Sequence, residues 1–153
     1  MSALNRRDIA ESDWAAILDL ANASVAHVAG AGTQEEWYEN RRGFDASKGT
    51  QHHYVLEDTE RGEIAGYGGV EKSPHGEFRF FIVTLPQRLD TVGERLFQEN
   101  MKIARELGAE RVWFTEYADD AVLLAFAKAR DFQELGRIRL HEAVEATTLM
   151  KSL

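Results

Sequence analysis

The sequence contains no cysteine, which excludes disulfide bonds, thiolate zinc sites and a cysteine nucleophile. It also has no apolar run near the roughly 18 residues that a membrane-spanning helix needs. Acidic residues outnumber basic ones, and the formal net charge is −8. Because nucleic acids and anionic membranes bind clustered Lys and Arg, we expect neither as a partner.

Other missing signals narrow the functional classes further. Residues 1–14 contain basic residues but no apolar segment behind them, so no signal peptide is predicted and we expect a cytoplasmic protein. His52 and His53 would point to opposite faces of a strand, and we predict no metal site. The sequence lacks the nucleophile-elbow pattern that is typical of many hydrolases, so it gives no positive signal for that class. With 153 residues, 44% of them hydrophobic, the chain fits a single domain over residues 1–153.

The strongest structural signal lies between residues 78 and 108. Residues 80–83 form an apolar run that is typical of a buried central strand. Pro86 ends that strand, and Thr91 followed by Glu94 has the spacing of a capping box at a helix start. A strand that enters a helix through a tight loop can bind an anion, because the first helical amides lack intrahelical partners, although most such units bind nothing.

The helix after this loop is expected to run from about Val92 to Leu107. Gly108 follows it, at the position where a left-handed residue ends many helices. Apolar residues recur at helical spacing along one side: Val92, Leu96, Met101, Ile103, Ala104 and Leu107.

The remaining elements follow from local periodicity and turn residues. We expect strands near residues 3–9, 52–56, 64–70, 111–117 and 135–144, helices near 12–25, 33–42 and 120–130, and a loop at 43–51. Ser12 is the expected cap of the first helix, and the tail after residue 146 is expected to fray. Gly66, Gly68 and Gly69 indicate a bulge or a close backbone approach in one strand.

The element order, strand, helix, helix, three strands, helix, strand, helix, strand, resembles that of the GNAT acetyltransferase superfamily from about residue 4 to 144. The acetyl-CoA signature of that family resembles the loop after residue 86. Arg88 and Gly93 occupy its outer positions, and Thr91 stands where the inner glycine is usual. A second family feature, a helix begun by Asn with Tyr near its end, resembles residues 119–132, with Asp120 and Ala127 at those two positions.

The resemblance implies a mixed α/β (α+β) fold, with a central mixed, mostly antiparallel sheet flanked by helices. It also implies transfer of an acyl group, usually acetyl, from acetyl-CoA to a primary amine of a small molecule or a peptide. Asp120 is a further expected cofactor contact. The pyrophosphate of acetyl-CoA is expected to bind the backbone amides of one loop, formed by Arg88, Leu89, Asp90, Thr91, Val92, Gly93 and Glu94. The thioester oxygen is expected to accept a hydrogen bond from a backbone amide at the end of the central strand, at Ile82, Val83 or Thr84.

The amine must lose a proton, which suits a carboxylate acting directly or through water. Glu116, at the end of a buried strand, is the first candidate and Glu77 the second, with Tyr117 as a candidate proton donor to the leaving sulfur. Because neighbours in a regular strand point to opposite faces, Glu116 and Tyr117 share one site only if the strand end twists or bulges.

A second class of function stays open. The departures at Thr91, Asp120 and Ala127 also fit a GNAT-shaped module that has lost catalysis and serves binding or dimerisation. A homodimer is accordingly an open alternative to a monomer.

Overall fold

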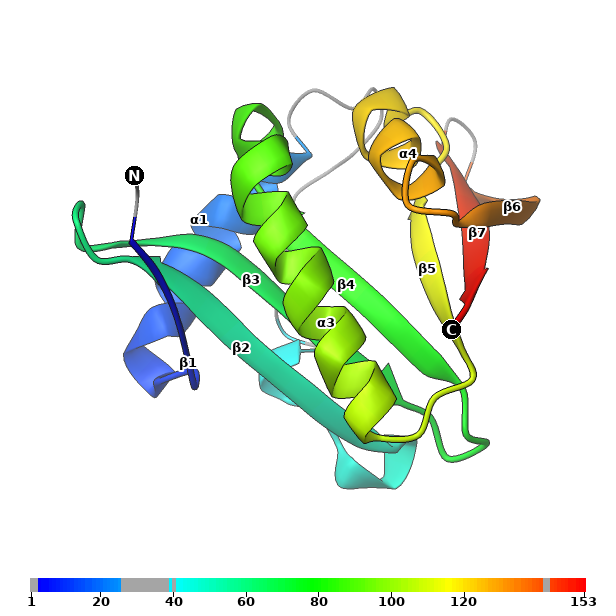
Figure 1. Ribbon diagram of the computed structural model, residues 1–153, viewed down its shortest axis with the longest axis horizontal. Helices are drawn as coiled ribbons and strands as arrows, with labels where there is room; N and C mark the ends of the chain where they lie inside the picture. Colours follow the sequence, from blue (N-terminus) through cyan, green and yellow to red (C-terminus); the bar gives the residue numbers. More distant parts are fainter. Residues whose placement is uncertain (1–2, 26–38, 40, 142–143) are drawn as a thin grey trace.

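The computed structural model describes residues 3–25, 39, 41–141 and 144–153 (Figure 1). The described residues form a mixed sheet of seven strands in the order β1-β2-β3-β4-β5-β7-β6. The strands are β1 (Leu4–Arg7), β2 (Thr50–Asp58), β3 (Glu63–Lys72), β4 (Phe78–Thr84), β5 (Arg111–Tyr117), β6 (Gln133–His141) and β7 (Val144–Ser152). All neighbouring pairs are antiparallel except β4 and β5, which confirms the predicted fold class.

The described helices cover opposite faces of this sheet (Figure 1). They are α1 (Trp14–Ser24), α3 (Glu94–Glu106) and α4 (Ala121–Lys128). Helix α1 packs Trp14, Ile17 and Ala21 against one face. Helices α3 and α4 build the larger core cluster on the other face. The helix expected at residues 33–42 lies largely outside the described residues.

The predicted capping box at Thr91 and Glu94 is wrong. The chain is already helical from Pro86, with a 3₁₀ turn at Pro86–Arg88 and a π-helical turn at Leu89–Gly93 before α3. Proline has a φ suited to a first helical turn, which moves the helix start forward. The Thr91 hydroxyl therefore donates to the carbonyl of Arg88, at 3.2 Å. The end of α3 is close to the prediction, and Gly108 has a left-handed φ of 81°.

The C-terminal prediction is also wrong, because the chain ends in two strands rather than one strand and a frayed tail. Strand β7 lies between β5 and β6 and pairs with both. Its inward residues, Thr147 and Leu149, are fully buried. Near the N-terminus, Asp13 rather than Ser12 accepts a backbone hydrogen bond, from the Ala10 amide at 2.7 Å.

The glycines of β3 allow α3 to lie close to the sheet. A Cβ on Gly66 would lie 2.8 Å from Val92 Cγ1, and one on Gly68 would lie 2.9 Å from Leu96 Cδ2. The close approach expected from the sequence is therefore present. The register between β2 and β3 also shifts, between Leu56 and Glu57.

The two parallel strands separate toward their carboxyl ends, and this positions the site. Strands β4 and β5 pair only through Arg79 with Trp113 and Phe80 with Phe114. Beyond that point β4 stays paired with β3 as far as Thr84, and β5 stays paired with β7. The sheet is thus opened between two strands that are each held from the outside.

A buried polar network lies where the separation begins. Asn100 of α3 is fully buried, and its Nδ2 donates to the carbonyl of Phe81, 3.1 Å away. Its Oδ1 accepts from the Tyr54 hydroxyl at 2.7 Å, and that hydroxyl also lies 3.0 Å from the Leu96 carbonyl. The first carbonyl of β4 beyond the β4–β5 ladder is therefore hydrogen-bonded to helix α3.

Candidate active site

A cavity of about 250 Å³ lies between the separated ends of β4 and β5. It extends from α1 on one face of the sheet to α4 on the other. Its lining consists of Ala21, Ser24, Val25, Phe81, Ile82, Val83, Thr84, Pro86, Leu89, Phe114, Thr115, Glu116, Tyr117, Asp120, Val122, Leu123 and Ala146. The splay of the sheet brings together residues that the sequence placed on separate elements.

Glu116 and Tyr117 both line this cavity, so the end of β5 brings two adjacent residues to one site. Glu116 is half-buried, and its Oε1 accepts from the Tyr117 amide at 2.8 Å. Burial raises the pKa of Glu116 to about 8, the negative charge of Asp120 acts in the same direction, and the hydrogen bond from Tyr117 opposes it. The cavity therefore contains a carboxyl group that titrates near neutral pH.

Asp120 lines the cavity and begins helix α4. Its Oδ1 accepts from the Leu123 amide at 3.1 Å, as an N-cap does, and the residue is buried. Among the described lining residues Glu116 and Asp120 carry carboxyl groups, and none of the described lining residues is basic. The cavity accordingly favours a positively charged group such as an ammonium ion.

Glu77, the second candidate base, lies away from the cavity. It precedes the first residue of β4, whereas the cavity lies at the last residues of that strand. Its carboxylate lies 3.4 Å from the Arg79 guanidinium, and both side chains are about half exposed. The structure therefore does not place Glu77 with Glu116 and Tyr117.

The helical segment after Pro86 begins beside the cavity, and Pro86 and Leu89 line it. The side chain of Arg88 turns away, because its guanidinium pairs with Asp58 at 3.1 Å and Glu63 at 3.5 Å at the β2–β3 turn. Asp90 and Thr91 are exposed. Any anion contact of this loop therefore depends on its backbone amides rather than on the Arg88 side chain.

The buried end of the same loop packs into the core. Val92 and Gly93 are both buried, and a Cβ on Gly93 would lie 2.6 Å from Leu89 Cδ1. The absence of a side chain at residue 93 thus lets the loop fold tightly at the start of α3.

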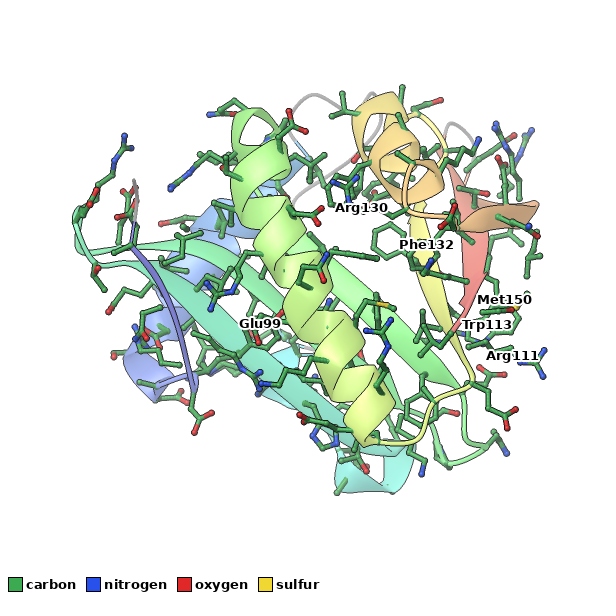
Figure 2. The ribbon with its side chains drawn as sticks, in the orientation of Figure 1. Glu99, Arg111, Trp113, Arg130, Phe132 and Met150 are labelled. Atoms are coloured by element: carbon green, nitrogen blue, oxygen red, sulfur yellow. The ribbon has the colours of Figure 1, made fainter. Side chains whose placement is uncertain are left out.

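Sequence reasoning missed Arg130, which lies between the end of α4 and the start of α3 (Figure 2). Its Nε donates to the Glu94 carboxylate at 2.7 Å, and its Nη1 donates to the Phe126 carbonyl at 2.9 Å. The guanidinium carbon also lies 3.5 Å from the centroid of the Phe126 ring. No local pattern signals this position, because Glu94 is 36 residues away.

The site thus consists of two parallel strands that separate beside the start of a helix, with a carboxyl group in the gap between them. The model of the Acetyltransferase (GNAT) family matches residues 14–132. The chain therefore belongs to the GNAT acetyltransferase family. This confirms the predicted resemblance and the predicted class of enzyme. No helix in the described part of the chain is long and apolar enough to cross a membrane.

Solved structures of acetyltransferases share this fold. A protein assigned as a phosphinothricin N-acetyltransferase is 22% identical, with a TM-score of 0.76 and 99% of each chain covered. An acetyltransferase from Streptococcus agalactiae is 12% identical, with a TM-score of 0.78 and 100% of each chain covered. A protein from Salmonella typhimurium, assigned as an acetyltransferase and solved with acetyl-CoA, is 18% identical, with a TM-score of 0.68. The alignment covers 98% of the present chain and 94% of the Salmonella chain. No curated protein matches the sequence.

Proposed function

We propose that the protein transfers an acetyl group from acetyl-CoA to a primary amine of a small molecule or a peptide, with Glu116 as the general base. The observation that carries the proposal is the half-buried Glu116 carboxyl, with a pKa of about 8, in the gap between β4 and β5. Acetyl-CoA is the co-substrate. A cytoplasmic location and a homodimer stay predictions.

The reaction forms a bond between the amine nitrogen and the thioester carbonyl carbon and breaks the bond from that carbon to sulfur. An amine reaches the enzyme mainly as an ammonium ion, which the carboxyl group of Asp120 and the ionised form of Glu116 attract. Only the neutral amine is a nucleophile, so Glu116 takes the proton, directly or through one water. A base with a pKa near the working pH is well suited to this transfer.

The β4 backbone supplies the donors for the thioester oxygen. Beyond Phe80, no described strand pairs with the edge of β4 that faces β5. Within residues 82–84, the backbone amides that lie on this edge therefore point into the gap. The Thr84 hydroxyl already donates to the Ala65 carbonyl at 3.0 Å, so only the backbone of this residue is available. Donors fixed by the sheet stabilise charge that develops on the oxygen without reorganising.

The residues around the start of α3 fit the anionic part of coenzyme A. The helical segment from Pro86 begins at the edge of the cavity, where a helix start favours negative charge, and its Arg88 amide is already bonded to the Leu85 carbonyl at 2.9 Å. Arg130 lies at the same end of α3, where its guanidinium forms an ion pair with Glu94. Tyr117, which lines the cavity, is the phenol proposed to protonate the leaving sulfur, since Ala127 has no proton to donate.

Calorimetric titration with acetyl-CoA, followed by turnover with a broad panel of amines, tests the proposal. We expect saturable binding and measurable acetylation. Binding without turnover of any amine would favour the non-catalytic module, and the absence of binding would overturn the proposed co-substrate.

We expect Arg130→Gln to weaken acetyl-CoA binding about tenfold, because a charged hydrogen-bond donor to phosphate is lost. Calorimetry measures the affinity, and thermal unfolding checks that the loss of the Glu94 ion pair leaves the protein folded. Arg139→Gln is the matched control, since Arg139 is 69% exposed on β6 and its nearest ion pair is long, at 3.9 Å. Equal affinities for the two variants would remove Arg130 from the cofactor site.

A further inference from the structure

The active-site cavity has an apolar wall on the α1 side of the sheet. Phe81 and Val83 of β4 line the cavity there, and they pack into the same core cluster as Ala21 of α1, which also lines it. Val25, which follows the last residue of α1, and Ala146 of β7 are further apolar lining residues. A substrate that lies on this side of the cavity therefore meets mainly hydrocarbon.

The polar side chain that α1 contributes to this wall is already engaged. Ser24 lines the cavity, and its hydroxyl donates to the carbonyl of Ala21 in the preceding turn, at 2.8 Å. Its hydrogen is therefore not offered to a ligand. The wall thus favours an acceptor with an apolar body over one that needs hydrogen-bond donors.

The charge of the cavity comes from two carboxyl groups, Glu116 and Asp120, with no lysine, arginine or histidine among the described residues that line it. The sequence outside the described residues contains no lysine or arginine either. A carboxylate carried by the acceptor would lie close to like charges without a cation to pair with. Like charges in a site that is partly removed from water repel strongly.

Arg41 is the cation that contacts this wall, and it lies outside the cavity. Its guanidinium carbon is 4.6 Å from the centroid of the Phe81 ring, and its guanidinium forms an ion pair with Glu71. The carboxylate of Glu71 thus already neutralises this charge, and Arg41 does not line the cavity.

We propose that the acceptor is a small primary amine with an apolar body and no carboxylate beside the amino group, rather than a free amino acid. The inference rests on the proposed function, in which Glu116 takes the amine proton. The amino group lies toward Glu116 and Asp120, and the apolar body lies against Phe81 and Val83. The bond from nitrogen to the acetyl carbon forms, the bond from that carbon to sulfur breaks, and coenzyme A leaves as its thiol with a proton from Tyr117.

The test compares kcat/KM, with acetyl-CoA as donor, for two matched pairs of acceptors: phenethylamine against phenylalanine, and isoamylamine against leucine. The members of each pair differ only by a carboxylate. We expect each amine to be acetylated at least about a hundredfold more efficiently than its amino acid, because one unpaired like charge in a partly buried site costs a factor of this order. Phenylalaninamide separates charge from size, and it should be acetylated at least about tenfold more efficiently than phenylalanine.

Val25→Arg supplies a cation to the wall and should reduce the preference for the amine at least about tenfold. Val25 is half-buried at the C-terminal end of α1, where a positive charge is favourable. Ala23→Arg is the matched control, since it adds the same side chain at an exposed position of α1 outside the cavity and should leave the preference unchanged. Val25→Lys replaces Val25→Arg if the arginine lowers the melting temperature.

Equal efficiencies for an amine and its amino acid in the parent would overturn this inference and leave the proposed function standing, as would turnover confined to peptide amines. Rejection of phenylalaninamide as strong as that of phenylalanine would also overturn it, because size rather than charge would then decide. An unchanged preference in a folded Val25→Arg would count against it in the same way. Failure of the parent to bind acetyl-CoA would overturn the proposed function and this inference together.

Discussion

Glu116→Gln is expected to lower kcat/KM about a hundredfold to ten-thousandfold while leaving the affinity for acetyl-CoA unchanged. Glutamine keeps the shape of the side chain and can still accept the hydrogen bond from the Tyr117 amide, but it cannot take a proton. General-base catalysis by a positioned side chain contributes rate factors of about this size. Steady-state kinetics with an amine substrate, together with calorimetric titration, measures the two quantities.

The pH profile distinguishes a base from a residue that only supports the site. With a pKa of about 8, Glu116 becomes a carboxylate as the pH rises, so kcat/KM of the parent should rise up to about pH 8. The variant should lack this rise. Glu77→Gln is the matched control, because Glu77 is exposed and lies at the opposite end of β4 from the cavity. A parent profile identical to that of Glu116→Gln would exclude Glu116 as the base.

The free energy of unfolding gives a second, independent readout of the same substitution. The folded protein raises the pKa of Glu116 from 4.5 to about 8, so between these values the folded state binds more protons than the unfolded state. The contribution of Glu116 to stability is therefore full below about pH 4.5 and is lost as the pH rises through about 8. Glu116→Gln should match the parent near pH 4 and exceed it in stability near pH 9. Lower activity with lower stability near pH 9 would instead indicate a structural role.

The core of the fold was predictable because its signals are local. The apolar run before Pro86, the helical stripe of α3 and Gly108 lie within one stretch of sequence, and each specifies its own element. The capping box failed although it is local. A proline that begins a helical turn overrode the later Thr91, whose hydroxyl then bonded to the Arg88 carbonyl. Competing helix starts in one loop cannot be ranked from spacing alone.

The geometry of the site could be predicted only in part. Glu116 and Tyr117 were placed at a strand end, but their meeting in one cavity depends on where the β4–β5 ladder stops. That point is set by contacts across the fold, such as the bond from Asn100 to the Phe81 carbonyl. Arg130 was missed for the same reason, because its pairing with Glu94 joins distant segments. Strand β7 was not predicted, because the buried polar residue Thr147 interrupts the apolar alternation that indicates a strand.

The dependence of the splay on Asn100 leads to the second large expected effect. Replacing the buried Asn100 with leucine, which has a similar volume, leaves the Phe81 carbonyl without its side-chain donor. An unsatisfied buried carbonyl costs about 1–3 kcal/mol. The Tyr54 hydroxyl loses one partner but keeps the Leu96 carbonyl, which limits the additional cost. We expect Asn100→Leu to lower the free energy of unfolding by about 2–3 kcal/mol, measured by denaturant titration.

Activity should fall further than this loss of stability explains, because Phe81 is the first residue of β4 beyond its pairing with β5. A shifted strand end misplaces the amides of residues 82–84 and the gap that faces Glu116, and a displacement of about 1 Å can cost about a hundredfold in rate. We therefore expect kcat/KM to fall at least tenfold at a temperature where Asn100→Leu is still folded. Tyr54→Phe is the matched control, since it removes the hydroxyl but leaves the bond from Asn100 to the Phe81 carbonyl intact. That variant should lose about 1 kcal/mol of stability and no activity. A folded Asn100→Leu with full activity would show that β4 keeps its position beside the cavity without the hydrogen bond from α3.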